Sequence, residues 1–191
     1  MYSINDLAVP KSPFLDTQTN RPTREWLMYL LELGRQPVYG AFASTTNQSV
    51  SAVNTPTRVA FDTVDVANQI YYTTGDGIHL QQDGVYNVQF SVQITNDDTS
   101  THDAYIWFRL NGSDISNSAS FTSIVAKHGG VVGYGLLAAN FFFTLTAGDY
   151  IELWWATDST QVTLATLPAT TSPLAKPESP SVVVSLQKVN L

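Results

Sequence analysis

Histidine and acidic side chains are the groups in this sequence that could bind a metal, and their spacing offers few combinations. The histidines are His79, His102 and His128. None of them lies at zinc-ligand spacing from another histidine, and the chain has no cysteine. His102 lies near Asp97, Asp98 and Asp103, and a carboxylate-rich loop of this kind can hold calcium through its oxygens. The stretch follows no calcium-loop pattern, however, so we interpret it as a solvated turn and expect no bound metal.

The sequence also offers few residue patterns that could support acid–base or nucleophilic catalysis. The sequence contains no Gly-x-Ser-x-Gly elbow and no Walker-type phosphate loop. A glycosidase needs two facing carboxylates, whereas most of the 16 acidic residues fall in turn-like segments. Glu152 beside Trp154 is the acid that a strand could place in an aromatic cleft, although such a residue more often alternates outward to solvent. We therefore expect a protein that is not an enzyme and needs no cofactor.

The composition of the 191-residue chain favours a protein that buries surface in an assembly. Charged residues make up 13% and aromatic residues 12%, and the charged fraction is about half of the usual value. Interface cores are likewise depleted in charge and enriched in aromatic side chains. The net charge of −7 and the 9 scattered Lys and Arg residues argue against nucleic acid as a partner, because phosphate binding needs clustered basic groups.

The sequence shows neither a secretion signal nor a membrane-spanning segment. Its first residues lack the basic and apolar regions of a signal peptide. The most apolar stretch, residues 131–145, is interrupted by Gly133, Gly135 and Asn140 and is too short to cross a bilayer.

Residues 1–37 are predicted to form an anchor consisting of an extended arm and one short helix. Asn20 is a suitable helix cap, and Gly34 followed by Pro37 signals the end of the helix. The anchor face is formed by apolar side chains at helical spacing, namely Trp26, Leu27, Leu30 and Leu33. A helix this short is marginal alone in water, so this face must pack on other copies around an axis, on the body of the chain or on another surface.

Residues 38–191 are predicted to form one domain built from strands. Apolar and polar side chains alternate in residues 86–94 and 104–110, which is the pattern of a half-buried strand. Gly and Asp turn signals separate these from further apolar runs at 57–61, 78–80, 138–145 and 150–156. Residues 166–180 are predicted to be an exposed Pro-rich loop, and residues 182–186 a strand covered on both faces. Many short strands without interleaved helices indicate a sandwich or barrel.

The order of these segments resembles the jelly-roll family of complement globular heads and tumour necrosis factor. The Asp-Gly turn at 83–84, ahead of a Tyr-led strand, is similar to a turn of that family. The strand 104–110 with its Asn-Gly turn at 111–112 resembles the next long strand, and the Leu-Thr-Ala-Gly-Asp run at 145–149 resembles the family's Leu-x-x-Gly-Asp turn. The resemblance covers residues 39–191. The chain departs from the family in lacking an aromatic-Gly pattern in its closing strand and a collagen-like stalk.

The resemblance implies an all-β, two-sheet jelly-roll sandwich that assembles as a homotrimer. Closed symmetric homo-oligomers are common, which makes such an assembly physically reasonable. The candidates for the trimer interface are four aromatic side chains, Trp107, Tyr150, Trp154 and Trp155. Ordinary core packing is the alternative for each of them.

Residues 20–27 resemble short N-terminal segments that precede domains of bacteriophage virion proteins. This resemblance leads to the hypothesis of a structural protein located in the virion, a trimeric capsid decoration, cement or head-fibre protein. Its arm would bind the major capsid protein or another virion component. The alternative is a tail or fibre knob whose loops bind a host-surface glycan or protein. Candidate recognition residues are Asp97, Asp98, His102, Asn111 and Asn117.

Overall fold

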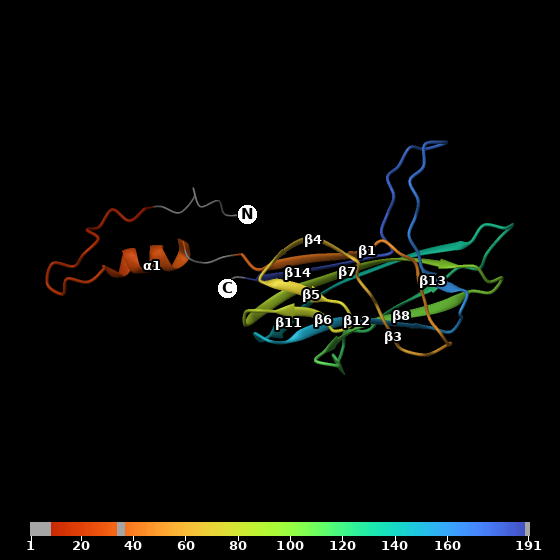
Figure 1. The fold of residues 1–191 in the computed structure, drawn as a ribbon, viewed down its shortest axis with the longest axis horizontal. Coiled ribbons are helices and arrows are strands. Elements are labelled where there is room, and N and C mark those ends of the chain that lie inside the picture. The colour runs from red at the N-terminus through yellow and green to blue at the C-terminus, as the bar shows by residue number, and fades with distance from the viewer. Residues whose placement is uncertain (1–8, 34–36, 190–191) are drawn as a thin grey trace. The chain divides into compact units, whose positions relative to one another are not determined.

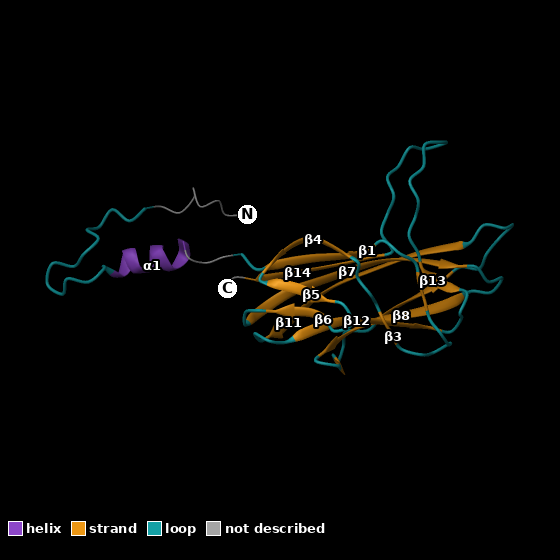
Figure 2. Cartoon of the chain, viewed as in Figure 1, coloured by secondary structure: helices purple, strands orange, loops and turns teal. Residues whose placement is uncertain are grey.

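The chain divides into two compact units, Met1–Pro37 and Val38–Leu191. The computed structural model describes residues 9–33 and 37–189. Within the first unit the described residues form an extended segment and one helix, and the second unit is a β-sandwich (Figures 1 and 2).

The helix α1 (Arg24–Leu33) begins after a turn that is built by Asp16. The Asp16 carboxylate accepts hydrogen bonds from the backbone N–H groups of Gln18 and Thr19, at 2.9 and 2.8 Å. Asn20 has a φ of +54° within this turn, so its predicted role as the helix cap is wrong. Thr23 directly precedes the helix instead, and its backbone carbonyl accepts the N–H of Leu27 at 2.9 Å.

The strands form two antiparallel sheets, each with seven strands among the described residues. The first sheet contains β1 (Tyr39–Ser44), β2 (Gln48–Ser49), β4 (Thr63–Asn68), β7 (Gly84–Asn96), β11 (Gly133–Leu145), β13 (Val162–Leu164) and β14 (Val182–Val189). The second sheet contains β3 (Thr57–Arg58), β5 (Ile70–Thr73), β6 (Gly77–Leu80), β8 (His102–Leu110), β9 (Ser113–Asp114), β10 (Ser120–Ile124) and β12 (Tyr150–Thr157).

The closing strand β14 lies in the middle of the first sheet, between β1 and β7. The prediction that both faces of this strand are covered holds for one face only: Val182, Val184 and Leu186 are buried in the core, whereas Val183 and Ser185 on the other face are partly exposed and Gln187 is exposed. The other side of β7 pairs with β11 along the full length of both strands, from Gly133 opposite Asn96 to Leu145 opposite Gly84. Among the described strands β11 pairs with no other, so it forms an edge of the sheet. Gly133 is required where β11 begins, because a Cβ there would overlap the carbonyl group of Val125.

The core fills the space between the two sheets and is built from alternate residues of their strands. The inward side chains of β7 are Tyr86, Val88, Phe90, Val92 and Ile94, all buried. Those of β8 include Ala104, Ile106 and Phe108. Both sets match the alternation predicted from the sequence. The predicted strand at 57–61 is shorter than expected, because β3 ends at Arg58 while Val59 and Phe61 enter the core beyond it.

Residues 166–180 leave the sandwich as a hairpin that is held together by its own hydrogen bonds (Figure 1). Leu167 and Ser179 exchange backbone hydrogen bonds of 3.1 and 2.8 Å, and Thr170 and Lys176 exchange bonds of 3.0 and 2.9 Å. Leu174 is 70% exposed. The predicted exposure of this segment is confirmed, and its backbone pairing is an addition that the composition did not indicate.

Candidate interaction surfaces

The outward face of β11 exposes large apolar side chains along the edge of the first sheet. Tyr134, Leu136 and Phe142 are 57%, 60% and 61% exposed. The opposite face of the strand packs on the core, where the ring of Phe141 lies 5.8 Å from that of Phe108. An antiparallel sheet with one solvated face usually presents polar residues there. The 13 residues of β11 include no charged side chain, and the polar side chains on its outward face, Asn140 and Thr144, are uncharged.

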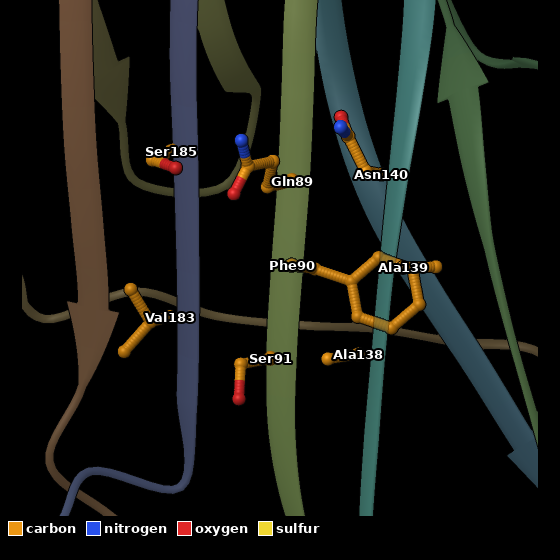
Figure 3. Close-up of a pocket in the computed structure, with 8 residues that line it drawn as sticks. All are labelled: Gln89, Phe90, Ser91, Ala138, Ala139, Asn140, Val183 and Ser185. Carbon is orange, nitrogen blue, oxygen red and sulfur yellow. The ribbon is translucent and has the colours of Figure 1, made fainter.

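The neighbouring strands continue this uncharged face. Residues that pair directly across strands point to the same side of a sheet. Phe142 is opposite Asn87, Ala138 is opposite Ser91, and Ser91 is in turn opposite Val183 of β14. The small side chains leave a shallow hollow of about 410 Å³ across the three strands (Figure 3). It is lined by Gln89, Phe90, Ser91, Ala138, Ala139, Asn140, Val183 and Ser185.

The sequence-based candidates for the trimer interface lie on the other sheet, where two of them are covered by charged neighbours. The Trp107 indole N–H donates to Oδ1 of Asp114 at 2.7 Å. The Arg109 guanidinium lies 3.8 Å from the centre of the Trp154 ring and donates to the same Asp114 oxygen at 2.6 Å. A hydrogen bond from Arg109, and to a smaller extent one from Trp107, lowers the pKa of the Asp114 carboxyl. Trp107 and Trp154 are therefore held in a network within their own chain, and each is only half-buried.

Tyr150 belongs to a second group of rings on the same outer face. His79 stacks on Tyr71 with ring centres 4.9 Å apart, and the Tyr150 ring lies 5.5 Å from His79 on β6. Glu152, two residues beyond Tyr150, was expected to face solvent, but it is 6% exposed and pairs with Arg58 at 3.1 Å. That expectation is wrong because β3 pairs with β12 and lays Arg58 beside the carboxylate.

Trp155 is a core residue, with 0% of its surface exposed. It points inward because it shares the inward alternation of Ile151 and Leu153 along β12. Its proposed place in a trimer interface is therefore wrong, and core packing, the alternative, is correct.

Replacing Trp155 with alanine is expected to lower the free energy of unfolding by roughly 3–5 kcal/mol, because it leaves a large cavity in the core. Denaturant unfolding at one fixed protein concentration measures this loss. The matched substitution Trp107→Ala removes a half-buried ring and should cost clearly less. If the Trp155→Ala variant instead had an unchanged free energy of unfolding and a reduced oligomer mass, Trp155 would lie in an interface.

The five candidate recognition residues lie at opposite ends of the sandwich. Asp97, Asp98 and His102 lie where β8 begins, whereas Asn111 and Asn117 follow the end of β8. A nine-residue strand spans roughly 30 Å, so the two groups do not form one site. Asn111 helps to build a turn, since its side chain donates to Oδ1 of Asp149 at 2.8 Å and accepts the backbone N–H of Tyr150 at 3.0 Å.

At the other end of β8, the group around His102 is connected by ion pairs. Nδ1 of His102 lies 3.0 Å from Asp158, and Nε2 lies 3.1 Å from Asp98. Asp97 pairs with Lys127. Sequence reasoning missed Asp158 and Lys127, which are 56 and 25 residues from His102 in the chain. No three His, Cys, Asp or Glu side chains in the described part of the chain are arranged as metal ligands.

The helix α1 has two different apolar faces. Trp26 packs inside its own unit, with its ring 5.4 Å from Phe14 and 5.6 Å from Tyr29, and its indole N–H donates to the Ser12 carbonyl at 2.8 Å. The exposed apolar face consists of Leu27, Leu30 and Leu31, at 50%, 45% and 57% exposure. Of the predicted anchor residues, Trp26 is thus partly enclosed, Leu27 and Leu30 are exposed, and the side chain of Leu33 lies outside the described residues.

Solved structures resemble the chain, among them murine APRIL and Eiger TNF from S. frugiperda. Murine APRIL aligns with a TM-score of 0.53 and 13% sequence identity over 81% of this chain and 100% of that chain. The second unit has a tumour necrosis factor-like jelly-roll fold. Eiger TNF from S. frugiperda gives a TM-score of 0.50 and 14% identity over 82% of this chain and 94% of that chain. Identities this low show the fold alone. No family model and no curated protein matches the sequence.

The all-β jelly roll with a preceding helix, predicted from the order of the turns, is confirmed by this likeness. The described helix is too short to cross a membrane, and no other helix occurs among the residues that the structure describes.

Proposed function

We propose that this chain is a non-enzymatic structural protein of a bacteriophage virion, a homotrimeric jelly-roll knob attached by its N-terminal unit. The observation that carries the trimer is the outward face of β11, where three large apolar side chains are more than half exposed without a charge on the strand. Extended apolar patches of this kind on a soluble domain are typical of protein–protein contacts.

The trimer would form through the β11–β7–β14 face of the jelly roll. On β11, Leu136 and Phe142 lie two residues before Ala138 and two residues after Asn140, which line the hollow. The polar side chains that line the hollow are uncharged (Figure 3). Burying uncharged amides and hydroxyls costs far less than burying ions. In a ring of three copies every copy buries both of its contact surfaces, whereas an open chain of copies leaves a contact surface exposed at each end.

The N-terminal unit supports an attachment role. Its leucine face on α1 has no partner that the described residues of that unit provide, and a ten-residue helix gains little stability without packing. Three arms on one trimer would act together, so that weak individual contacts give strong attachment. The virion assignment itself rests on the resemblance of residues 20–27 to N-terminal segments of phage virion proteins. The proposed binding partner of the arm is the major capsid protein or another virion component.

The solution mass of the full chain tests the assembly. Light scattering on a size-exclusion column should give about three times the chain mass of 20.9 kDa. A mass of one chain at micromolar concentration would contradict the proposal and would leave the β11 face without its expected partner.

A knob that binds a host-surface ligand is the second candidate function. Tyr105 and Phe121 stack at 5.8 Å on the outer face of the second sheet and are 44% and 63% exposed. The next cross-strand pair on the same face is Asp103 and Ser123. Exposed rings beside a carboxylate and a hydroxyl are suited to a ligand that has both apolar and hydroxyl groups, such as a glycan.

A further inference from the structure

His102 lies between two carboxylates at one end of the jelly roll. Its Nδ1 is 3.0 Å from Oδ1 of Asp158, and its Nε2 is 3.1 Å from Oδ2 of Asp98. The side chain is 16% exposed, so water reaches little of the ring. Both ring nitrogens therefore face oxygen atoms of acidic side chains.

Only the doubly protonated imidazolium satisfies both contacts. An ionised carboxylate accepts hydrogen bonds and has none to donate, whereas a neutral imidazole carries a single N–H. In either neutral tautomer the lone pair of one ring nitrogen would face a carboxylate oxygen. Hydrogen bonds between two ionised partners are also the stronger kind. Loss of the proton thus turns one of the two attractive contacts of His102 into a repulsive one.

The two carboxylates belong to different connections between strands. Asp98 lies between β7 and β8, and Asp158 lies between β12 and β13. The Asp98 carbonyl accepts the backbone N–H of Lys127 at 2.7 Å, which joins the β10–β11 connection to the same point. The Asp158 carboxylate accepts the backbone N–H of Asp103 at 3.1 Å. Three connections therefore meet at His102, directly or through one further hydrogen bond.

The other charged groups around His102 do not replace its positive charge. Lys127, from the β10–β11 connection, pairs with Asp97. Asp103, next to His102 on β8, accepts a hydrogen bond from the hydroxyl of Ser123 on β10. Carboxylates outnumber cations in this group, so removal of the imidazolium charge leaves like charges facing one another.

We propose that protonated His102 is a pH-dependent clamp that holds the β7–β8, β10–β11 and β12–β13 connections together and opens as the pH rises. The proposal does not depend on the virion assignment. Asp98 and His102 are also candidate recognition residues, so the binding of any partner to the clamped loops would be coupled to pH through the same equilibrium.

The sign of the pH dependence follows from the pKa shifts. Partial burial disfavours the imidazolium, but the hydrogen bond to Asp98 and the charge of Asp158 outweigh it, and the pKa of His102 is raised above 6.5. The stabilisation from His102 is then complete below 6.5 and is lost as the pH rises through the folded-state pKa. The hydrogen bond from His102 lowers the pKa of Asp98 below 3.8, so the contribution of Asp98 is lost only in acid, as the pH falls through that lower value.

An NMR titration of the full chain tests the clamp. The chain has three histidines, so the substitutions His79→Gln, His102→Gln and His128→Gln assign their ring signals. We expect the His102 ring to titrate above 6.5. We also expect the exchange protection of the Lys127 and Asp103 amides, corrected for intrinsic exchange, to fall as His102 loses its proton. Linkage sets the size of this fall at up to tenfold for each unit by which the pKa is raised.

The variant His102→Gln keeps a hydrogen-bonding side chain but cannot carry a charge, so this pH dependence should disappear. The exposed His128 provides the matched control, and His128→Gln should keep the wild-type behaviour. A His102 ring that titrates at or below 6.5 in the wild-type chain would overturn the proposal. So would a His102→Gln variant in which the protection of Lys127 and Asp103 still falls with pH as in the wild type.

Discussion

Substitution of Leu136 and Phe142 by aspartate is expected to convert the proposed trimer into monomers. Both side chains are about 60% exposed in the single chain and would be covered in the proposed interface. Burial of a large apolar side chain contributes roughly 1.5–3 kcal/mol, and an unpaired carboxylate buried in its place adds a further penalty. Because every subunit carries both changes, the effect applies at each contact of the ring. Light scattering should show the mass falling from about three chains to one.

The monomeric variant should stay folded, since both substitutions are on the outward face of an edge strand. Circular dichroism and an unchanged fluorescence spectrum of the four tryptophans check this point. The matched control replaces Val53 and Leu174, which are 48% and 70% exposed and lie outside the strands, with the same two aspartates. This control should remain trimeric. A trimeric Leu136→Asp/Phe142→Asp variant would show that β11 does not form the interface.

The proposed interface was not among the sequence predictions, and the reason is physical. The sequence shows which side chains are large and apolar, but the pairing of strands decides whether they are covered. Trp155 and Trp154 are adjacent on β12, yet one lies in the core and the other under Arg109. The size of a tryptophan ring does not show whether it is covered. A more informative signal is the 13-residue run of β11, which contains no charged residue although one face of the strand is solvated.

Local patterns were sufficient for the elements, and contacts distant in sequence were not. Alternation in β7 and β8 and the turn residues between strands gave the sandwich, because a period of two and Gly or Asp turns are local properties. The pairing of Arg58 with Glu152 spans 94 residues and that of His102 with Asp158 spans 56. In both pairs, nothing in the sequence near one member indicates its distant partner. The polarity of the candidate recognition loops likewise does not show that the length of β8 separates them.

The proposed virion function predicts that substitution of Leu27 and Leu30 by aspartate abolishes attachment of the proposed trimer to virus particles. These side chains are exposed on α1, whereas Trp26 packs against Phe14 and Tyr29 within its own unit. A change at Trp26 would therefore confuse loss of structure with loss of binding. Attachment through three arms can exceed the affinity of one by about 10²–10⁴. Weakening all three arms should reduce binding by at least this factor, measured by co-sedimentation with particles that lack the protein.

The control for this variant places the same two charges elsewhere on the arm, at Thr17 and Gln18, whose side chains are exposed in the turn held by Asp16. It should bind particles normally, and both variants should keep the trimer mass. A Leu27→Asp/Leu30→Asp variant that still decorates particles would exclude the leucine face as the anchor. If the same variant instead became monomeric, the helices would pack on one another around the axis, and the arm would be an assembly element. Trimers that do not bind particles but do bind host cells, both with and without the two α1 substitutions, would favour the receptor-binding knob.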